Sequence, residues 1–286
     1  MRPLVITGPT AAGKSAEAIR IAERFNATIV SMDAMQVYRR MDIGTAKIDL
    51  ATRTRIAHQC IDIRNPDEPF SAADFVAEAN AAIAEGGPVI LCGGTPFYLR
   101  AFLFGLVQAP ATDATLRERF EALESPHSAL HAVDPMLAAR LHPNDRVRLI
   151  RGLEYHAISG KRLSEMHDAD PHIRRDCEVV WLDADDLYAR IDARVVQMMS
   201  AGYLDEVRGL LASGIGRFAK PMQSLGYKHL ACHVLDNLSL PEAVRLTQRD
   251  TRHFSRKQRT FLRGLGFAPG GDLASAADRA FLARKG

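Results

Sequence analysis

The sequence holds few cysteines, few aromatic residues and no long hydrophobic run. Its 286 residues include four cysteines, none of them in a C-x-x-C pair, so we expect free thiols and neither a disulfide framework nor a cysteine-based metal centre. No apolar run approaches the roughly 18 residues that span a bilayer, so no membrane partner is predicted. The first apolar run begins almost at once, so we expect no signal peptide and a cytoplasmic location.

Strong overall charge is also missing. The net charge is only +3, so a polyanionic partner has to be inferred from where the charges gather. Hydrophobic residues make up 47% and charged residues 25%, which is typical of globular proteins, and we find no repeats or low-complexity segments. A chain of this length forms one large domain or one domain with an insertion.

Residues 8–15 have the pattern G-x-x-x-x-G-K-S, which is typical of a phosphate-binding loop. An apolar run, residues 4–7, precedes the loop, and a helical pattern follows it. The glycines, the helix start and Lys14 would bind a diphosphate or polyphosphate, and the Ser15 hydroxyl would bind Mg²⁺. The alternative is a glycine turn that binds nothing. The predicted diphosphate-binding residues are Gly8, Pro9, Thr10, Ala11, Ala12, Gly13, Lys14 and Ser15.

Further strands are predicted at residues 27–31, 88–92 and 178–182, with helical patterns between them. This alternation predicts an α/β fold with a P-loop NTPase-like parallel sheet flanked by helices. Residues 109–175 show helical patterns but no convincing strand, and we interpret them as a helical insertion domain. The core domain would then comprise residues 1–108 and 176–286. A long helix is predicted over residues 241–263.

Two polar residues follow predicted strands and are candidates for chemistry. Asp33 could act as a base or hold Mg²⁺ through water, and the Thr95 hydroxyl could bind a ligand. A helix cap or a simple turn is the alternative for each. Because ligands gather at the carboxyl ends of parallel strands, we expect Asp33, Thr95 and Lys14 to converge there. Asp62 and Asp183 also end apolar runs and compete for the metal role, although solvent-facing positions are favoured for them.

Arginines form three helical groups. Arg190 and Arg194 are four residues apart, and their partner could be a phosphate group or a surface carboxylate, Asp186 or Asp192. Arg148 and Arg151 share a helix face that suits phosphates, with a solvated face as the alternative. The long helix carries a stripe at three- and four-residue steps, which favours nucleic acid but also fits a charged outer face. The stripe consists of Arg252, Arg256, Arg259 and Arg263.

These features together leave three classes of function open. A small-molecule kinase would hold ATP on the loop and use Asp33 to deprotonate the acceptor. A transferase that modifies nucleic acid fits better, because a kinase has no need of a basic stripe. A nucleotide switch would need a base-specificity motif, and we find none.

Several motifs resemble those of the tRNA dimethylallyltransferases, also called tRNA isopentenyltransferases. The resemblance spans residues 4 to about 264, and residues 41–47 with 142–145 are its most specific part. The matching segments are 8–15, 33–47, 93–99, 142–151, 224–228 and 251–263.

The resemblance implies transfer of dimethylallyl from dimethylallyl diphosphate to N6 of the adenosine directly 3′ of the anticodon, in tRNAs that read codons starting with U. It assigns catalytic roles to Asp33 as the base, to Thr95 and to Arg194, with Mg²⁺ as cofactor at Ser15. The implied partner is the tRNA anticodon stem-loop, bound by a monomer. The implied tRNA-binding residues are Asp33, Ala34, Met35, Gln36, Thr95, Arg117, Val147, Arg148, Leu149, Ile150, Arg151, Gln223, Ser224, Leu225, Gly226, Tyr227 and Lys228.

The chain departs from the family pattern at a few positions. Ala34 replaces a usual Ser and removes one hydroxyl contact to RNA. Arg40 replaces Gly, Ile48 replaces Pro, and Gly152 replaces Ala after the arginine helix. Residues 58–60 are His-Gln-Cys where His-His-Leu is usual. A related possibility is prenyl transfer to free adenine nucleotides, but a mononucleotide would not need the helical insertion or the basic helix.

Overall fold

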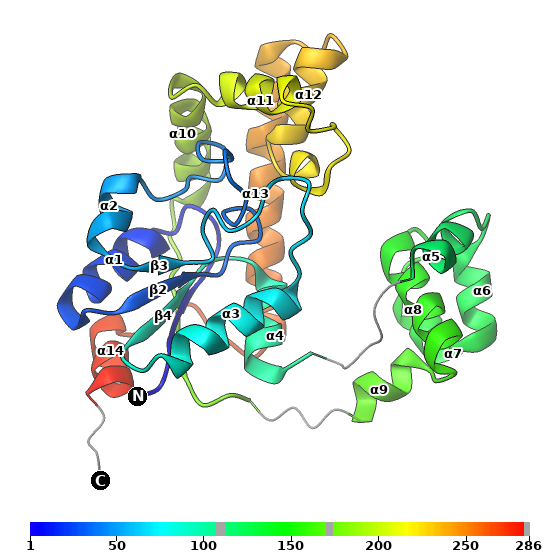
Figure 1. Ribbon diagram of the computed structural model, residues 1–286, viewed down its shortest axis with the longest axis horizontal. Coiled ribbons are helices and arrows are strands. Elements are labelled where there is room, and N and C mark those ends of the chain that lie inside the picture. The colour runs from blue at the N-terminus through cyan, green and yellow to red at the C-terminus, as the bar shows by residue number, and fades with distance from the viewer. Residues whose placement is uncertain (107–112, 170–173, 283–286) are drawn as a thin grey trace. The chain divides into compact units, whose positions relative to one another are not determined.

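The computed structural model describes residues 1–106, 113–169 and 174–282 (Figure 1). It divides into two compact units, Met1–Leu103 with Arg175–Gly286, and Phe104–Arg174. The expected first boundary, after residue 108, lies outside the described residues. Among the described residues, no helix combines the length and the apolar character needed to cross a membrane. Their four cysteines are free thiols, as expected.

The first unit is built on a parallel sheet in the order β3-β2-β4-β1-β5. This confirms the predicted α/β fold. The predicted strands correspond to all but β3, a pair of residues too short and too polar for a periodic pattern to indicate it. The strands are β1 (Leu4–Thr7), β2 (Thr28–Ser31), β3 (His58–Gln59), β4 (Val89–Cys92) and β5 (Glu178–Trp181).

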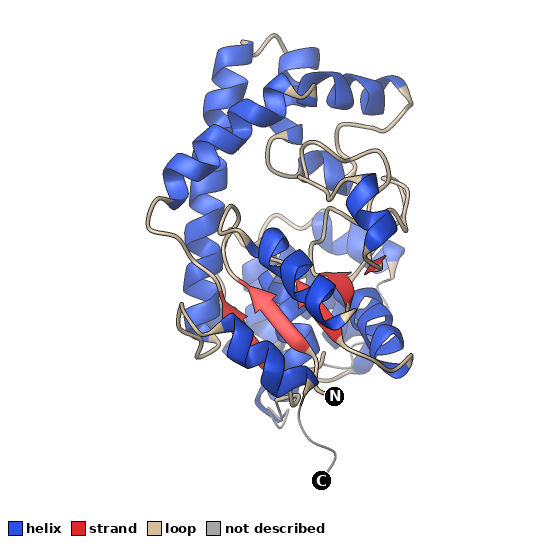
Figure 2. Ribbon diagram, turned by 90° about the vertical axis from the view of Figure 1, so that its left-hand side faces the viewer, coloured by secondary structure: helices blue, strands red, loops and turns tan. Residues whose placement is uncertain are grey.

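Helices cover both faces of this sheet (Figure 2). Helices α1 (Lys14–Phe25) and α14 (Leu273–Phe281) share one apolar core with Leu4, Ile6 and Ile90 of the strands. Helix α3 (Ala72–Ala84) packs against β2 and β4 and begins with a capping box at Ser71. Helices α2 (Leu50–Arg55) and α4 (Pro96–Phe104) complete this part. The sheet is therefore packed between helices on both of its faces.

A group of helices in the first unit extends beyond the sheet (Figure 1). The longest, α13, packs against α10 and α12, and α11 packs against both α10 and α12. Ser239 caps the start of α13. The members are α10 (Leu187–Ser200), α11 (Tyr203–Ala212), the 3₁₀ helix η1 (Lys220–Gln223), α12 (Tyr227–Leu235) and α13 (Leu240–Gly264).

The described residues of the second unit form helices joined by short turns and contain no strand. Its core includes Leu130, Leu137, Leu149 and Leu153. A Cβ on Gly152 would lie 2.8 Å from the side chains of both Leu130 and Leu137, so this close packing accounts for glycine at that position. The helices are α5 (Ala114–Glu121), α6 (Pro126–Val133), α7 (Pro135–Arg140), α8 (Arg146–Ser159) and α9 (Leu163–Ala169).

Candidate functional site

The phosphate loop connects the end of β1 to the start of α1. Gly8 and Gly13 have positive φ angles of 139° and 85°, which glycine adopts at low cost. A Cβ on Gly8 would lie 2.0 Å from the Leu182 carbonyl oxygen, so a larger residue does not fit. Within the described chain, the backbone N–H groups of Gly13, Lys14 and Ser15 donate to no other residue. These groups are available to an anion at the N-terminus of α1.

Two other amides of the loop are engaged inside the protein. The Ala12 N–H donates to the Pro9 carbonyl oxygen at 3.4 Å. The Thr10 N–H donates to Oε1 of Gln258 at 2.9 Å. Thr10 belongs to the predicted diphosphate-binding loop, and its amide is already satisfied by a side chain from α13.

Two cations stand close to the loop. Lys14 Nζ donates to the Pro9 carbonyl oxygen at 2.6 Å. Burial lowers the pKa of Lys14 from 10.5 to about 8, and the nearby positive charge of Arg194 contributes to this shift. Burial also lowers the pKa of Arg194, which makes no hydrogen bond or salt bridge with any described residue. Arg194 thus has its donors free for an anion, whereas Arg190 is paired with Asp186 at 2.7 Å.

Asp33 and Thr95 follow β2 and β4, which are adjacent strands. The Thr95 N–H donates to the Met32 carbonyl oxygen at 3.2 Å, and Thr95 Oγ1 accepts from the Ala34 N–H at 3.0 Å. A Cβ on Gly93 would lie 2.2 Å from the Met32 carbonyl oxygen, so only glycine permits this approach. Thr95 therefore holds the backbone directly beside Asp33.

The Asp33 carboxylate is fixed but carries no ion pair among the described residues. Its Oδ1 accepts from the Met35 N–H at 2.8 Å. Its negative charge acts on both Lys14 and Arg194 by raising the pKa of each. The structure thus brings Asp33, Thr95, Lys14 and Arg194 together at one end of the sheet, as expected for strand ends.

Loop 41–47 is held by one carboxylate that the sequence did not single out, Glu206 of α11. Its oxygens accept hydrogen bonds from consecutive backbone N–H groups of the loop and from one hydroxyl, namely Asp42 and Ile43 at 2.7 Å each, Gly44 at 3.0 Å and Tyr227 at 2.6 Å. The Tyr203 ring occupies the space where a Gly44 Cβ would lie, 2.2 Å away. Segments distant in the sequence, 41–47 and 224–228, therefore meet at α11.

Replacing Glu206 with Gln should destabilise the protein by about 2 kcal/mol, because an amide NH₂ group would face N–H donors and leave them unsatisfied. Equilibrium unfolding in urea measures the change. Asp205→Asn is the matched control, since the Asp205 side chain is 78% exposed and, among the described residues, pairs only with Arg208. Equal stability of the two variants would contradict the role assigned to Glu206.

Two candidate metal-binding carboxylates are occupied by basic residues. Asp62 pairs with Lys47 at 2.7 Å and with Arg53 at 2.6 Å. Asp183 pairs with Arg259 at 2.6 Å. Both carboxylates therefore form ion pairs within the protein, where the sequence had suggested a metal ligand or a solvent-facing side chain.

Ser15 is exposed at the start of α1, so its hydroxyl suits a Mg²⁺ that also takes diphosphate oxygens and water. The described residues contain no group of three or more His, Cys, Asp or Glu side chains able to hold a metal ion.

The residues predicted to bind tRNA in the first unit differ in accessibility. The Gln36 side chain is engaged by Ser31 and by the Thr45 carbonyl oxygen, and Tyr227 is buried with its hydroxyl on Glu206. The polar groups of both side chains form hydrogen bonds within the protein, and an RNA contact by these two residues stays a prediction. Gln223 is exposed, and Lys228 pairs with Asp250 at 3.2 Å.

The second unit divides its predicted residues in the same way. The side chains of Leu149 and Ile150 are buried, and their contact with RNA stays a prediction. Val147 is 68% exposed, and the Arg148 side chain is 72% exposed beside Asp145. Arg117 pairs with Glu121 at 3.1 Å.

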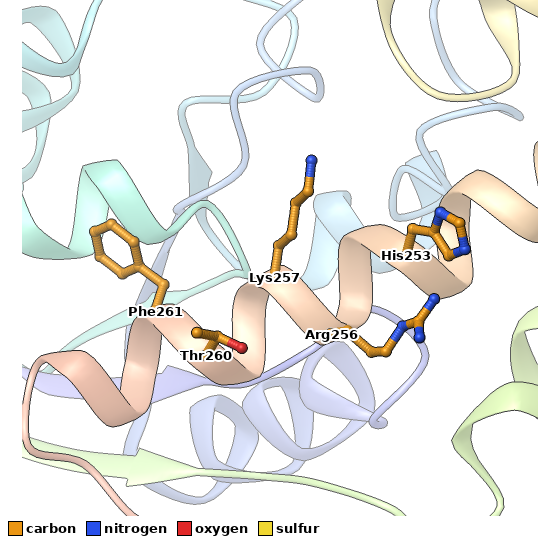
Figure 3. Close-up of a pocket in the computed structure, with 5 residues that line it drawn as sticks. All are labelled: His253, Arg256, Lys257, Thr260 and Phe261. Carbon is orange, nitrogen blue, oxygen red and sulfur yellow. The ribbon is translucent and has the colours of Figure 1, made fainter. Parts of the chain in front are cut away.

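The arginine stripe on α13 is split by its partners. Arg252 pairs with Asp192 of α10, and Arg259 pairs with Asp183 after β5, so both fasten the helix to the core. Arg256 is exposed, together with its neighbour Lys257, and neither forms a hydrogen bond or salt bridge with a described residue. These two line a hollow of about 420 Å³ with other residues of α13 (Figure 3), namely His253, Thr260 and Phe261.

The sequence of residues 36–265 matches the family described as IPP transferase. The tRNA dimethylallyltransferase 1 of Citrifermentans bemidjiense is 44% identical over 271 residues, which cover 91% of this chain and 89% of that protein. The chain belongs to this family, the tRNA dimethylallyltransferases. The tRNA dimethylallyltransferase of Geobacter metallireducens is 43% identical over 276 residues, covering 92% and 89% of the two chains.

Solved structures of tRNA dimethylallyltransferases have the same fold. The tRNA isopentenylpyrophosphate transferase of Staphylococcus epidermidis matches with a TM-score of 0.64 at 31% identity, covering 92% of this chain and 90% of that one. A eukaryotic dimethylallyltransferase acting on tRNA matches with a TM-score of 0.78 at 26% identity, covering 91% and 69%.

Proposed function

We propose that this chain transfers the dimethylallyl group from dimethylallyl diphosphate to N6 of the adenosine directly 3′ of the anticodon, in tRNAs that read codons starting with U, and releases diphosphate. The observation that carries the proposal is the placement of Asp33, which has no ion pair with a described residue, beside two cations at the phosphate loop, Lys14 and Arg194. Membership in the tRNA dimethylallyltransferase family supports it.

The donor diphosphate would lie on the free N–H groups of Gly13, Lys14 and Ser15. Negative charge grows on the diphosphate as the allylic C–O bond breaks. Lys14 and Arg194, which forms no ion pair with a described residue, would stabilise that charge. When bound, Mg²⁺ at the Ser15 hydroxyl would supply further charge neutralisation.

The acceptor is an exocyclic amine, which is a weak nucleophile. Asp33 would accept the proton that N6 loses as its bond to the allylic carbon forms. The carboxylate suits this role because no described residue forms an ion pair with it and its orientation is fixed by the Met35 N–H. Thr95 would position Asp33 through the Ala34 amide. The adenosine must leave the stack of the anticodon loop to reach this carboxylate.

The tRNA would be bound by exposed cations with an adjacent aromatic ring. On α13 these are Arg256, Lys257 and Phe261, which line one hollow (Figure 3). Cations contact phosphates, and aromatic rings stack on unpaired bases of single-stranded loops. In the second unit, Arg148 is the most exposed of the predicted basic residues.

We expect the double substitution Arg256→Ala and Lys257→Ala to lower tRNA affinity and to reduce the salt slope of binding by about 1 to 2, because each phosphate contact releases counterions. Filter binding over a range of salt concentrations measures the slope. Arg245→Ala is the control on the same helix, since Arg245 is paired with Glu242 at 2.6 Å. A double variant with the slope of the unsubstituted protein would place this face away from RNA.

Mass spectrometry tests the reaction itself. The protein is incubated with Mg²⁺, dimethylallyl diphosphate and an unmodified anticodon stem-loop with three adenosines after its second anticodon base. A prenyl mass gain on the RNA, absent without the donor, is the expected result. Parallel incubations contain free AMP with the prenyl donor, or ATP with the same RNA. A mass gain on AMP alone would favour prenyl transfer to free nucleotides. Consumption of ATP without any mass gain would favour the kinase.

A further inference from the structure

Gln258 is an uncharged residue inside the most basic stretch of the chain. It lies on α13 between Lys257 and Arg259, yet its side chain is 2% exposed. Of its two neighbours in the sequence, Lys257 is exposed and Arg259 is paired with Asp183. A buried amide among cations requires hydrogen-bond partners, because an unsatisfied one is costly.

Both ends of the Gln258 amide are used, and each contacts a different loop of the site. Oε1 accepts from the Thr10 N–H of the phosphate loop at 2.9 Å. Nε2 donates to the Gly94 carbonyl oxygen at 2.6 Å. One side chain therefore joins the loop after β1 to the loop after β4, across 248 and 164 residues of sequence.

The surrounding residues leave room for this contact. A Cβ on Gly94 would lie 2.6 Å from Nε2 of Gln258 and 3.1 Å from the Gly8 carbonyl oxygen. Gly94 therefore permits the approach of Gln258 as well as that of the phosphate loop. Arg259, the next residue, anchors this part of α13 to Asp183.

From this geometry we infer that Gln258 is a positioning residue that fixes the phosphate loop in its anion-binding conformation, a role that rests on the proposed binding of a diphosphate there. It holds the Thr10 amide against α13, while the amides of Gly13, Lys14 and Ser15, which donate to no described residue, stay available to an anion. The same helix carries Arg256 and Lys257 on its exposed face, so the proposed RNA surface and the diphosphate site share one rigid element.

The test replaces Gln258 with Met, which has a similar length and no hydrogen-bonding amide. We expect the dissociation constant of inorganic pyrophosphate, measured by calorimetry, to rise about tenfold, which is the factor for loss of one hydrogen bond of typical strength. The KM for dimethylallyl diphosphate should rise in proportion, while tRNA affinity stays unchanged. Exchange of the Thr10 amide hydrogen, followed by NMR in the free protein, should become faster.

Two further variants separate positioning from a general loss of structure. Gln248→Met removes an amide of the same helix that donates to the Asp192 carbonyl oxygen at 3.3 Å, and it should leave pyrophosphate binding unchanged. Gln258→Glu keeps an acceptor for Thr10, so it should restore slow exchange of that amide.

Pyrophosphate binding by Gln258→Met equal to that of the unsubstituted protein would overturn the inference, as would an equal loss in Gln248→Met. An unsubstituted protein that binds pyrophosphate but transfers no prenyl group would contradict the proposed function alone, and the comparison of the variants would still decide the role of Gln258.

Discussion

An Asp33→Asn enzyme is expected to bind tRNA normally and to lose about 10²- to 10⁴-fold in kcat, the range that a positioned general base contributes. Asparagine keeps an oxygen that can accept from the Met35 N–H, so the local fold should survive. It cannot take a proton from N6 of the adenosine. Single-turnover prenylation of the stem-loop measures the loss, and binding in the absence of donor measures the affinity.

The matched control is Asp205→Asn, which changes an exposed carboxylate that, among the described residues, pairs only with Arg208. Its kcat should equal that of the unsubstituted protein. If Asp33→Asn retained a near-normal rate, Asp33 would not be the base, and the carboxylate would have only a structural role.

The second large effect is expected for Lys14→Met, which should reduce kcat by about 10²- to 10³-fold, as loss of one stabilising donor does. Affinity for the diphosphate should also fall, because the free N–H groups and Arg194 would act without the ammonium. Steady-state kinetics with dimethylallyl diphosphate give both numbers. Rates close to those of the unsubstituted protein would show that Lys14 does not stabilise the leaving diphosphate.

The same substitution should raise stability at neutral pH. The pKa of Lys14 is about 8 in the folded protein against 10.5 for an unperturbed lysine, because burial and Arg194 disfavour the ammonium. Between these two values the unfolded state binds more protons, so the free energy of unfolding rises with pH over that window. Below pH 8 the folded protein bears the full cost of the charge, and methionine removes it.

Thermal unfolding measures this effect. The melting temperature of Lys14→Met should exceed that of the unsubstituted protein at about pH 7, and the difference should shrink as the pH rises through the window. A lower melting temperature at about pH 7 would show that the ammonium stabilises the empty site. Such a trade of stability for function is common where a fold holds like charges together for a ligand.

The basic helix α13 shows what helical periodicity in a sequence can and cannot predict. Spacing placed Arg252, Arg256 and Arg259 on one stripe of a single helix, and the helix is there. Spacing could not show that Asp192 and Asp183 lie opposite two of these arginines, 60 and 76 residues away in the chain. We therefore expect RNA contacts from Arg256 and not from Arg252, although both belong to the same sequence pattern.

The sequence by itself determined the features that depend on contiguous residues. The phosphate loop follows from its glycines, Lys14 and Ser15 between a strand and a helix, because such a loop is built from local backbone geometry. The positions of Asp33 and Thr95 follow from strands that end just before them, since parallel strands place their carboxyl ends at one edge.

Only the tertiary structure decided which side chains hold these parts in place. Glu206 gathers loop 41–47 from a helix more than 160 residues further on, and Gln258 joins the two loops that flank Asp33 and Lys14. No sequence pattern indicated the partners of either residue, because a hydrogen bond between distant segments depends on how the chain is packed. The physical reason is that a buried donor or acceptor must be satisfied by whatever group the fold places beside it, and that neighbour is set by the packing of the whole chain.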